Sequence, residues 1–174
     1  MNIIEKRKQT KKNNIIKVIR EHEDVSRYVL KKETKYSMTT ILNSVAALVE
    51  DGLITEEEST QKSVGRTPVY LNVNPAGRCF IGIEFNAERI KAVIMNFGLD
   101  IEYSKKYVIP KGAKTEVIIE LIHVSVKETL EKVLDHSLIE GIGIGIPGYV
   151  DKNNGVALEY SYFKDWKNVA IRQI

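Results

Sequence analysis

The feature that most constrains this fold is the segment SVGRTPVYLNVNP, at residues 63–75, which separates two stretches of different periodicity. Before it, apolar residues recur at helical spacing. From Val69 onward they alternate with polar residues, which is the period of a half-buried strand. Gly65 allows a tight backbone turn, and Arg66 stands beside it ahead of the strand. The segment therefore predicts the tip and the return strand of a hairpin.

Three helical patterns precede this hairpin. Asn13 or Asn14 is the expected cap of the first, Ser26 of the second and Ser37 of the third, which Gly52 ends with a left-handed residue. Only residues 34–36 separate the second helix from the third. Two helices joined by so short a turn form a helix-turn-helix.

The third helix has the composition that a recognition helix needs. Its predicted buried face is Ile41, Val45, Leu48 and Val49. Short or polar side chains near its N-terminus are the candidate DNA contacts: Ser37, Met38, Thr39, Thr40, Leu42 and Asn43. Asn43 can pair with adenine, and the hydroxyl groups can hold phosphates. Gly65 and Arg66 are the candidate contacts at the hairpin tip, where an Arg suits a narrow minor groove. The alternatives are a three-helix bundle with no DNA role and, for Arg66, a solvated loop cation.

The charge is unevenly distributed along the chain. Residues 1–36 carry eleven Lys and Arg against five Asp and Glu, whereas residues 73–174 carry thirteen of each. A basic N-terminal part predicts an anionic partner, and the alternative is a solvated lysine-rich tail. We expect a cytoplasmic protein without a membrane partner, because the chain lacks a signal-peptide core and an apolar run of about 20 residues. Its one cysteine and three scattered histidines predict neither a disulfide framework nor a metal site.

The second half of the chain reads as strand, strand, strand, helix, strand. The strands are expected at 79–85, 89–97, 100–110 and 138–151, the last ending in a Pro-Gly loop, and the helix at 115–135, with Val117, Leu121 and Val124 on its apolar stripe. A crossover helix between strands predicts a mixed or parallel sheet. The last strand, with Gly143, Gly145 and Gly148, suits close packing and a backbone that approaches a ligand, or else a tight internal strand.

Three segments resemble parts of the ROK family of transcriptional regulators and sugar kinases. Residues 13–75, above all GRTPVYLNVNP, resemble the N-terminal domain of the regulators, which have a Gly-Arg-x-Pro wing. GIGIGIPGYVD, at 141–151, resembles the family's Gly-x-Gly-x-Pro-Gly-x-Val-Asp segment, and KDWKNVAI resembles its Gly-Trp-x-Asn-Val segment. The chain departs from the family at Lys35, where a Gly often closes the turn.

The resemblance implies an α/β fold in two domains. Residues 1–75 would form a winged helix-turn-helix, and residues 76–174 the incomplete first half of a ribonuclease-H-like, sugar-kinase-like domain. Because family regulators continue further, we expect a truncated form. Gly145, Pro147 and Gly148 would lie beside the sugar pocket, so that a full-length form would take a sugar or sugar-phosphate effector.

The function so implied is a DNA-binding repressor of a sugar-utilisation operon that reads an inverted repeat as a homo-oligomer. Xylose and N-acetylglucosamine are the family's usual associations, and nothing in the sequence selects between them. We expect no enzyme activity, no catalytic residue and no cofactor, because residues 84–88 lack the glycines and the Thr of the family's phosphate loop and Glu88 adds a carboxylate. The alternatives are a sugar kinase of the same family and a protein-interaction module that uses the winged helix.

Overall fold

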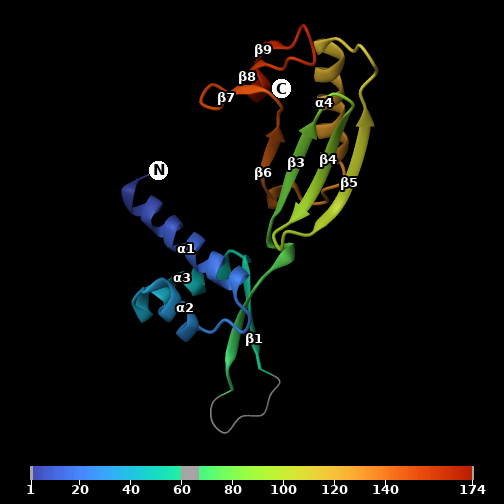
Figure 1. Ribbon diagram of the computed structural model, residues 1–174. Helices are drawn as coiled ribbons and strands as arrows, with labels where there is room; N and C mark the ends of the chain where they lie inside the picture. The colour runs from blue at the N-terminus through green and yellow to red at the C-terminus, as the bar shows by residue number, and fades with distance from the viewer. Residues whose placement is uncertain (1, 60–66, 174) are drawn as a thin grey trace. The chain divides into compact units, whose positions relative to one another are not determined.

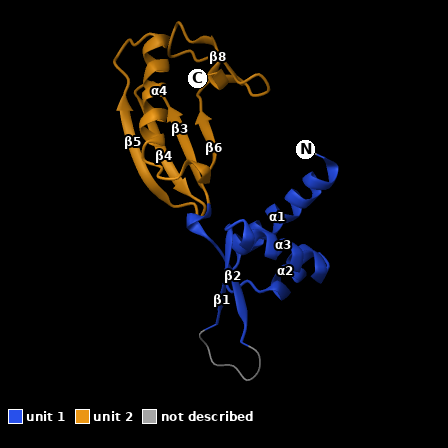
Figure 2. Ribbon diagram, turned by 180° about the vertical axis from the view of Figure 1, so that it is seen from behind, with its two compact units in different colours: residues 1–77 blue, residues 78–174 orange. Residues whose placement is uncertain are grey.

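The computed structural model describes residues 2–59 and 67–173, and the chain divides into two compact units, Met1–Gly77 and Arg78–Ile174 (Figure 1, Figure 2). The sequence places the boundary two residues earlier, after Pro75. The assignment of the units to a DNA-binding domain and a sugar-kinase-like domain stays a prediction. In the described part of the chain, no helix combines the length and the apolar character that crossing a membrane requires.

The first unit consists of three helices followed by an antiparallel hairpin. The helices are α1 (Ile3–Glu21), α2 (Arg27–Thr34) and α3 (Met38–Glu50), and the hairpin strands are β1 (Ile54–Glu58) and β2 (Val69–Val73). Helix α3 packs against α1, α2 and β1. One apolar core joins these elements, formed by Ile15, Ile16, Ile19, Val25, Leu30, Ile41, Val45, Leu48, Ile54 and Leu71.

Helix α1 begins about ten residues before the predicted start at Asn13 or Asn14, so that prediction is wrong. A capping box starts the helix at Asn2: its side-chain oxygen accepts from the Ile4 amide at 2.9 Å, and Glu5 accepts from the Asn2 amide at 2.9 Å. The buried stripe begins only at Ile15. Residues 3–10 are therefore an exposed, basic part of the helix with no apolar period for a sequence pattern to detect.

The caps of the next two helices are confirmed. The Ser26 hydroxyl accepts from the Val29 amide at 3.3 Å, and the Ser37 hydroxyl accepts from the Thr40 amide at 3.2 Å. Lys35 ends α2 in the left-handed conformation, with φ of 60°, at the position where family members often have Gly. Gly52, with φ of 70°, provides the predicted left-handed stop after α3. Val49, predicted to be buried, is 39% exposed.

The second unit is built on a mixed four-stranded sheet with strand order β5-β4-β3-β6. Its strands are β3 (Cys79–Phe85), β4 (Arg89–Asn96), β5 (Ile101–Val108) and β6 (Ile139–Gly145). Strands β3, β4 and β5 are antiparallel, and β6 lies parallel to β3 after the crossover helix α4 (Thr115–Leu130). The strand and helix order and the mixed sheet are thus as predicted, and α4 packs on one face of the sheet (Figure 1).

Two details of this unit differ from the sequence interpretation. The strand within 138–151 ends before the Pro-Gly loop as predicted, with β6 ending at Gly145, but the residues after the loop form a further strand: β7 (Tyr149–Asp151) belongs to a separate small sheet with β8 (Val156–Glu159) and β9 (Lys167–Val169). Helix α4 ends at Leu130, and its fully buried stripe is one residue out of phase with the prediction, formed by Ile118, Ile122, Ser125 and Thr129. A search for apolar residues does not detect this face, because it includes Ser125 and Thr129. These side chains can be buried because their hydroxyls donate to backbone carbonyls of the same helix.

A three-residue polar cluster ties β5 to α4. Lys105 Nζ and the Tyr107 hydroxyl donate to the same Glu128 oxygen at 2.5 and 2.6 Å. These two hydrogen bonds hold the pKa of Glu128 below its ordinary value, and the bond from Lys105 has the larger effect. A depressed folded-state pKa stabilises the fold above the unfolded pKa, and this contribution is lost as pH falls through the folded value.

We therefore expect Glu128→Gln to lower the free energy of unfolding of the second unit at pH 6. The difference from the wild type should shrink as pH falls below about 4.5, because protonation then removes the same charge. Urea unfolding at pH 6 and at pH 3, followed by the fluorescence of Trp166, measures both differences. A wild-type advantage that is equal at the two pH values would contradict this expectation.

Candidate nucleic-acid-binding surface

The N-terminal half of α3 presents its candidate contacts on one solvent-facing side. Met38 is 37% exposed and Leu42 47% exposed, and Thr39 and Asn43 are exposed beside them. The opposite side of the helix holds Ile41, Val45 and Leu48 in the core. The spacing of these positions thus places four of the predicted contact residues on a single accessible face.

Ser37 and Thr40 have a structural role at the start of the same helix. The Ser37 hydroxyl caps α3, and it also lies 2.9 Å from the Thr40 hydroxyl. Thr40 is half-buried and faces α1 rather than the side that carries Met38 and Leu42. These hydroxyls fix the first turn of α3, so they hold the exposed face in place whether or not they meet a phosphate.

The two candidate residues at the hairpin tip, Gly65 and Arg66, lie outside the described residues. The described strands reach close to them from both sides. Glu58 pairs with Val69 in the ladder, and the Ser59 amide donates to the Pro68 carbonyl at 2.8 Å. The hairpin register is therefore fixed on either side of residues 60–66.

Strand β1 carries three consecutive glutamates, which a phosphate backbone would repel. Two of them have partners within the first unit. Glu56 forms an ion pair with Arg27, and Glu57 accepts from the Asn72 amide group at 3.2 Å. These contacts direct two of the three carboxylates to protein groups, which limits the repulsion at this strand.

A groove that no sequence pattern predicted lies between α1 and α3. It has a volume of about 320 Å³ and is lined by Lys8, Lys11, Lys12, Thr40, Asn43, Ser44 and Ala47. The lysines come from the part of α1 that the pattern of apolar residues does not mark. The signal that could have found it is the sequence Asn-x-x-Glu at residues 2–5, which is typical of a helix start.

In the second unit, the loop between β3 and β4 is closed by a side chain. Asn86 Oδ1 accepts from the amides of Glu88 and Arg89 at 2.9 and 3.0 Å, and the Asn86 amide donates to the Arg89 carbonyl at 3.0 Å. Amides that point at their own loop are not available to hold phosphate oxygens. This geometry makes the loop a poor phosphate cradle for a second reason beyond its composition.

The glycines of the β6–β7 segment differ in how much space an added Cβ would have. Gly148 has φ of 90°, and an added Cβ would lie 2.1 Å from the Glu159 carbonyl oxygen. At Gly145 the nearest atoms would be 3.8 Å away, and at Gly143 no described atom would lie within 4 Å. Close packing therefore explains Gly148 but neither of the others. That Gly145, Pro147 and Gly148 border a sugar pocket stays a prediction.

The segment around Trp166, which follows β8 in the chain, covers the end of β3. Trp166 is fully buried, with its ring centroid 5.0 Å from that of Phe85. Among the described residues, no group of three or more His, Cys, Asp or Glu side chains is placed to hold a metal ion.

Comparison with known proteins identifies the class to which this architecture corresponds. The chain is 32% identical over 168 residues to a protein of Caldicellulosiruptor sp. (strain Rt8B.4) provisionally named a xylose repressor, and 28% identical over 168 residues to the xylose repressor of Caldicellulosiruptor bescii. Each match covers 96% of this chain and 42% of the relative. No family model matches the chain.

A solved structure shares the fold. It is a ROK-family transcriptional regulator described as a homologue of the E. coli MLC protein, with a TM-score of 0.73, 22% identity, and coverage of 94% of this chain and 41% of that one. These findings confirm the resemblance to ROK-family transcriptional regulators. Within that class, the relatives named here are xylose repressors, and the chain spans about two fifths of their length.

Proposed function

We propose that the chain is the DNA-binding part of a ROK-family repressor and that its first unit is a winged helix-turn-helix. The observation that carries the proposal is the single exposed face of Met38, Thr39, Leu42 and Asn43 on a helix whose other side is locked into the core. Helix α3 would enter the major groove of double-stranded DNA. The hairpin β1–β2 would be the wing, with Gly65 and Arg66 at the minor groove.

The second unit would be the first half of a ribonuclease-H-like effector domain that responds to a sugar or sugar phosphate. Gly145, Pro147 and Gly148 would border its pocket, and the names of the relatives favour xylose utilisation as the regulated process. Regulation rather than phosphoryl transfer is supported by the loop at 84–88, whose amides bond to Asn86. We propose no cofactor for this chain.

The repressor would act as a homo-oligomer on an inverted repeat, because a two-fold symmetric protein matches a palindromic site. One observation supports self-association through the second unit. Within the described residues β6 pairs on one side only, with β3, which leaves a strand edge open.

Substitutions at the two reading elements test this proposal. Asn43→Ala should weaken binding to the preferred duplex by about 1–3 kcal/mol while leaving binding to a scrambled duplex unchanged, because only base contacts carry sequence information. Arg66→Ala should also weaken binding, by about 1–3 kcal/mol. Fluorescence anisotropy with labelled duplexes measures both effects. Equal affinity of Asn43→Ala and the wild type for the preferred duplex would remove α3 as the reading helix, and unchanged affinity of Arg66→Ala would remove the wing.

A further inference from the structure

We propose that the groove between α1 and α3 holds a phosphate of the DNA backbone and that Lys8 and Lys11 supply its positive charge. This inference rests on the proposed DNA-binding function and adds a contact that the reading face of α3 does not include. The groove belongs wholly to the first unit and is formed by described residues.

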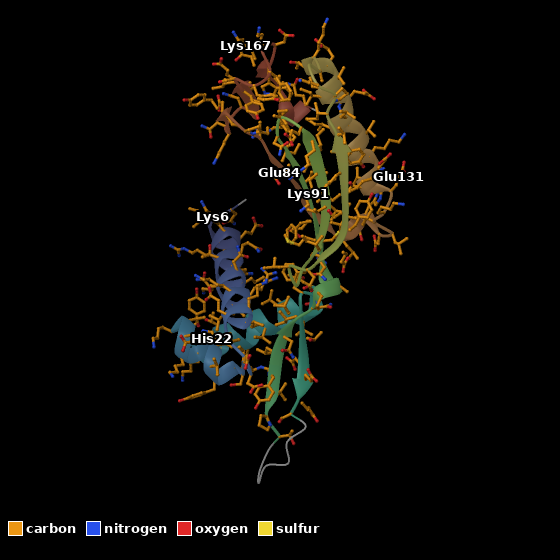
Figure 3. All side chains as sticks on the ribbon, turned by 45° about the vertical axis from the view of Figure 1, so that its right-hand side comes forward. Lys6, His22, Glu84, Lys91, Glu131 and Lys167 are labelled. Carbon is orange, nitrogen blue, oxygen red and sulfur yellow. The ribbon has the colours of Figure 1, made fainter. Side chains whose placement is uncertain are left out.

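Helical spacing gathers the groove's side chains. Lys8, Lys11 and Lys12 stand at intervals of three and four residues, so they share one side of α1. The same spacing brings Thr40, Asn43, Ser44 and Ala47 to the facing side of α3. The capping box at Asn2 starts α1 more than a turn before Lys8, which holds the lysines in helical geometry. The views of this unit show the N-terminal half of α1, where Lys6 is labelled, extending beyond α2 and α3 (Figure 2, Figure 3).

The charges around the groove favour an anion. Lys12 Nζ, which lines the groove, is paired with Asp51 at 2.6 Å, so the charge of that carboxylate is compensated. Glu5 accepts from the Asn2 amide at the far end of the helix. Among the described residues, Lys8 and Lys11 form no ion pair, and Lys11 Nζ lies 6.0 Å from the centroid of the Tyr36 ring. Two ammonium groups therefore remain for a ligand.

The neutral lining supplies hydrogen-bond donors for the same ligand. The hydroxyls of Thr40 and Ser44 favour an oxygen-rich anion, and the small Ala47 leaves room for it. The described residues that line the groove include no Arg and no aromatic side chain to recognise a planar base. Lysine ammonium groups with hydroxyls are typical of contacts that position a protein on phosphates without reading sequence.

The position of the groove selects DNA as the source of the phosphate. Thr40 and Asn43 line the groove, and both are among the candidate contacts of α3. A duplex seated on α3 would therefore pass its backbone across the mouth of the groove. The phosphate would belong to the same duplex whose bases Asn43 reads.

The test is the salt dependence of duplex binding by the full chain and by Lys8→Gln/Lys11→Gln. The slope of log affinity against log salt should fall in magnitude by about 0.9, which is the value for one lost phosphate contact, and affinity at low salt should fall about tenfold. The loss should be the same on the preferred duplex and on a scrambled one, so the ratio between them stays unchanged. Lys8→Arg/Lys11→Arg, which keeps both charges, should retain the wild-type slope.

A matched control removes the same charge elsewhere. Lys164→Gln/Lys167→Gln lies in the second unit, where Lys167 is labelled, and should leave the slope unchanged (Figure 3). Far-UV circular dichroism checks that each variant is folded.

The outcomes separate the inference from the function on which it rests. If the wild type discriminates between the duplexes but Lys8→Gln/Lys11→Gln keeps its slope and affinity, the groove holds no DNA phosphate and the DNA-binding function stands. If the wild type neither discriminates nor depends on salt, the proposed function itself is wrong. If calorimetry shows inorganic phosphate binding to the wild type but not to the Lys8→Gln/Lys11→Gln variant, while both proteins bind the duplex with the same affinity and salt slope, the groove binds a free anion and the inference is overturned.

Discussion

Replacing Leu48 by Ala should lower the free energy of unfolding of the first unit by about 2–5 kcal/mol. Leu48 is fully buried on α3, the helix that packs against α1, α2 and β1. Removing three carbons there leaves a cavity at the point where these elements meet. Because small domains have only about 5–15 kcal/mol of stability in total, the variant should lose much of its folded population and its DNA binding together.

The matched control is Leu42→Ala on the same helix. Leu42 is 47% exposed, so its removal should change stability by no more than about 0.5 kcal/mol, yet it should weaken DNA binding through the reading face. Urea unfolding followed by far-UV circular dichroism, in which α1, α2 and α3 contribute most of the helical signal beside α4, measures both variants. Equal destabilisation by the two substitutions would contradict the placement of Leu42 and Leu48 on opposite sides of α3.

Gly148→Ala should destabilise the second unit by about 2–5 kcal/mol, from a strained left-handed backbone and a steric clash together. The glycine has φ of 90°, and a Cβ there would lie 2.1 Å from the backbone oxygen of Glu159. This oxygen belongs to β8, so the clash cannot be relieved by rotating a side chain. The pairing of β7 with β8 should therefore be lost or displaced.

Gly145→Ala is the comparison that isolates this cause. Three residues earlier, the nearest atoms to an added Cβ would be 3.8 Å away, which is ordinary contact. This variant should stay within about 0.5 kcal/mol of the wild type. Because Trp166 is the chain's single tryptophan and is buried in the second unit, its fluorescence during urea unfolding reports on both variants. A Gly148→Ala variant as stable as Gly145→Ala would contradict the backbone geometry described for Gly148.

The sequence predicts the fold best where side-chain chemistry is local. Ser26 and Ser37 were identified as caps because a hydroxyl before a helix has few other roles, and Gly52 because a left-handed stop favours glycine. The order of strands and helix in the second unit also followed from periodicity. Of the candidate DNA contacts, the exposed face of Met38, Thr39, Leu42 and Asn43 could be predicted, because helical spacing alone separates it from the buried face.

Sequence patterns do not predict the structure where the presence or absence of a tertiary contact determines it. Residues 3–12 form a helix without burying an apolar stripe, so periodicity does not detect it, and the groove lined by Lys8 and Lys11 was missed with it. The buried face of α4 includes Ser125 and Thr129, whose hydroxyls are satisfied within the helix. An apolar pattern cannot mark a face that small polar residues complete.

The central claim is that this chain reads a DNA sequence, and selection from a random pool of double-stranded DNA tests it most directly. The full chain would be incubated with the pool, the bound duplexes recovered and sequenced over several rounds, and the enriched duplex titrated with salt. We expect enrichment of an inverted repeat whose affinity falls steeply as salt rises, because phosphate neutralisation releases counterions. A folded chain that enriches no sequence, and whose DNA binding does not depend on salt, would contradict the claim.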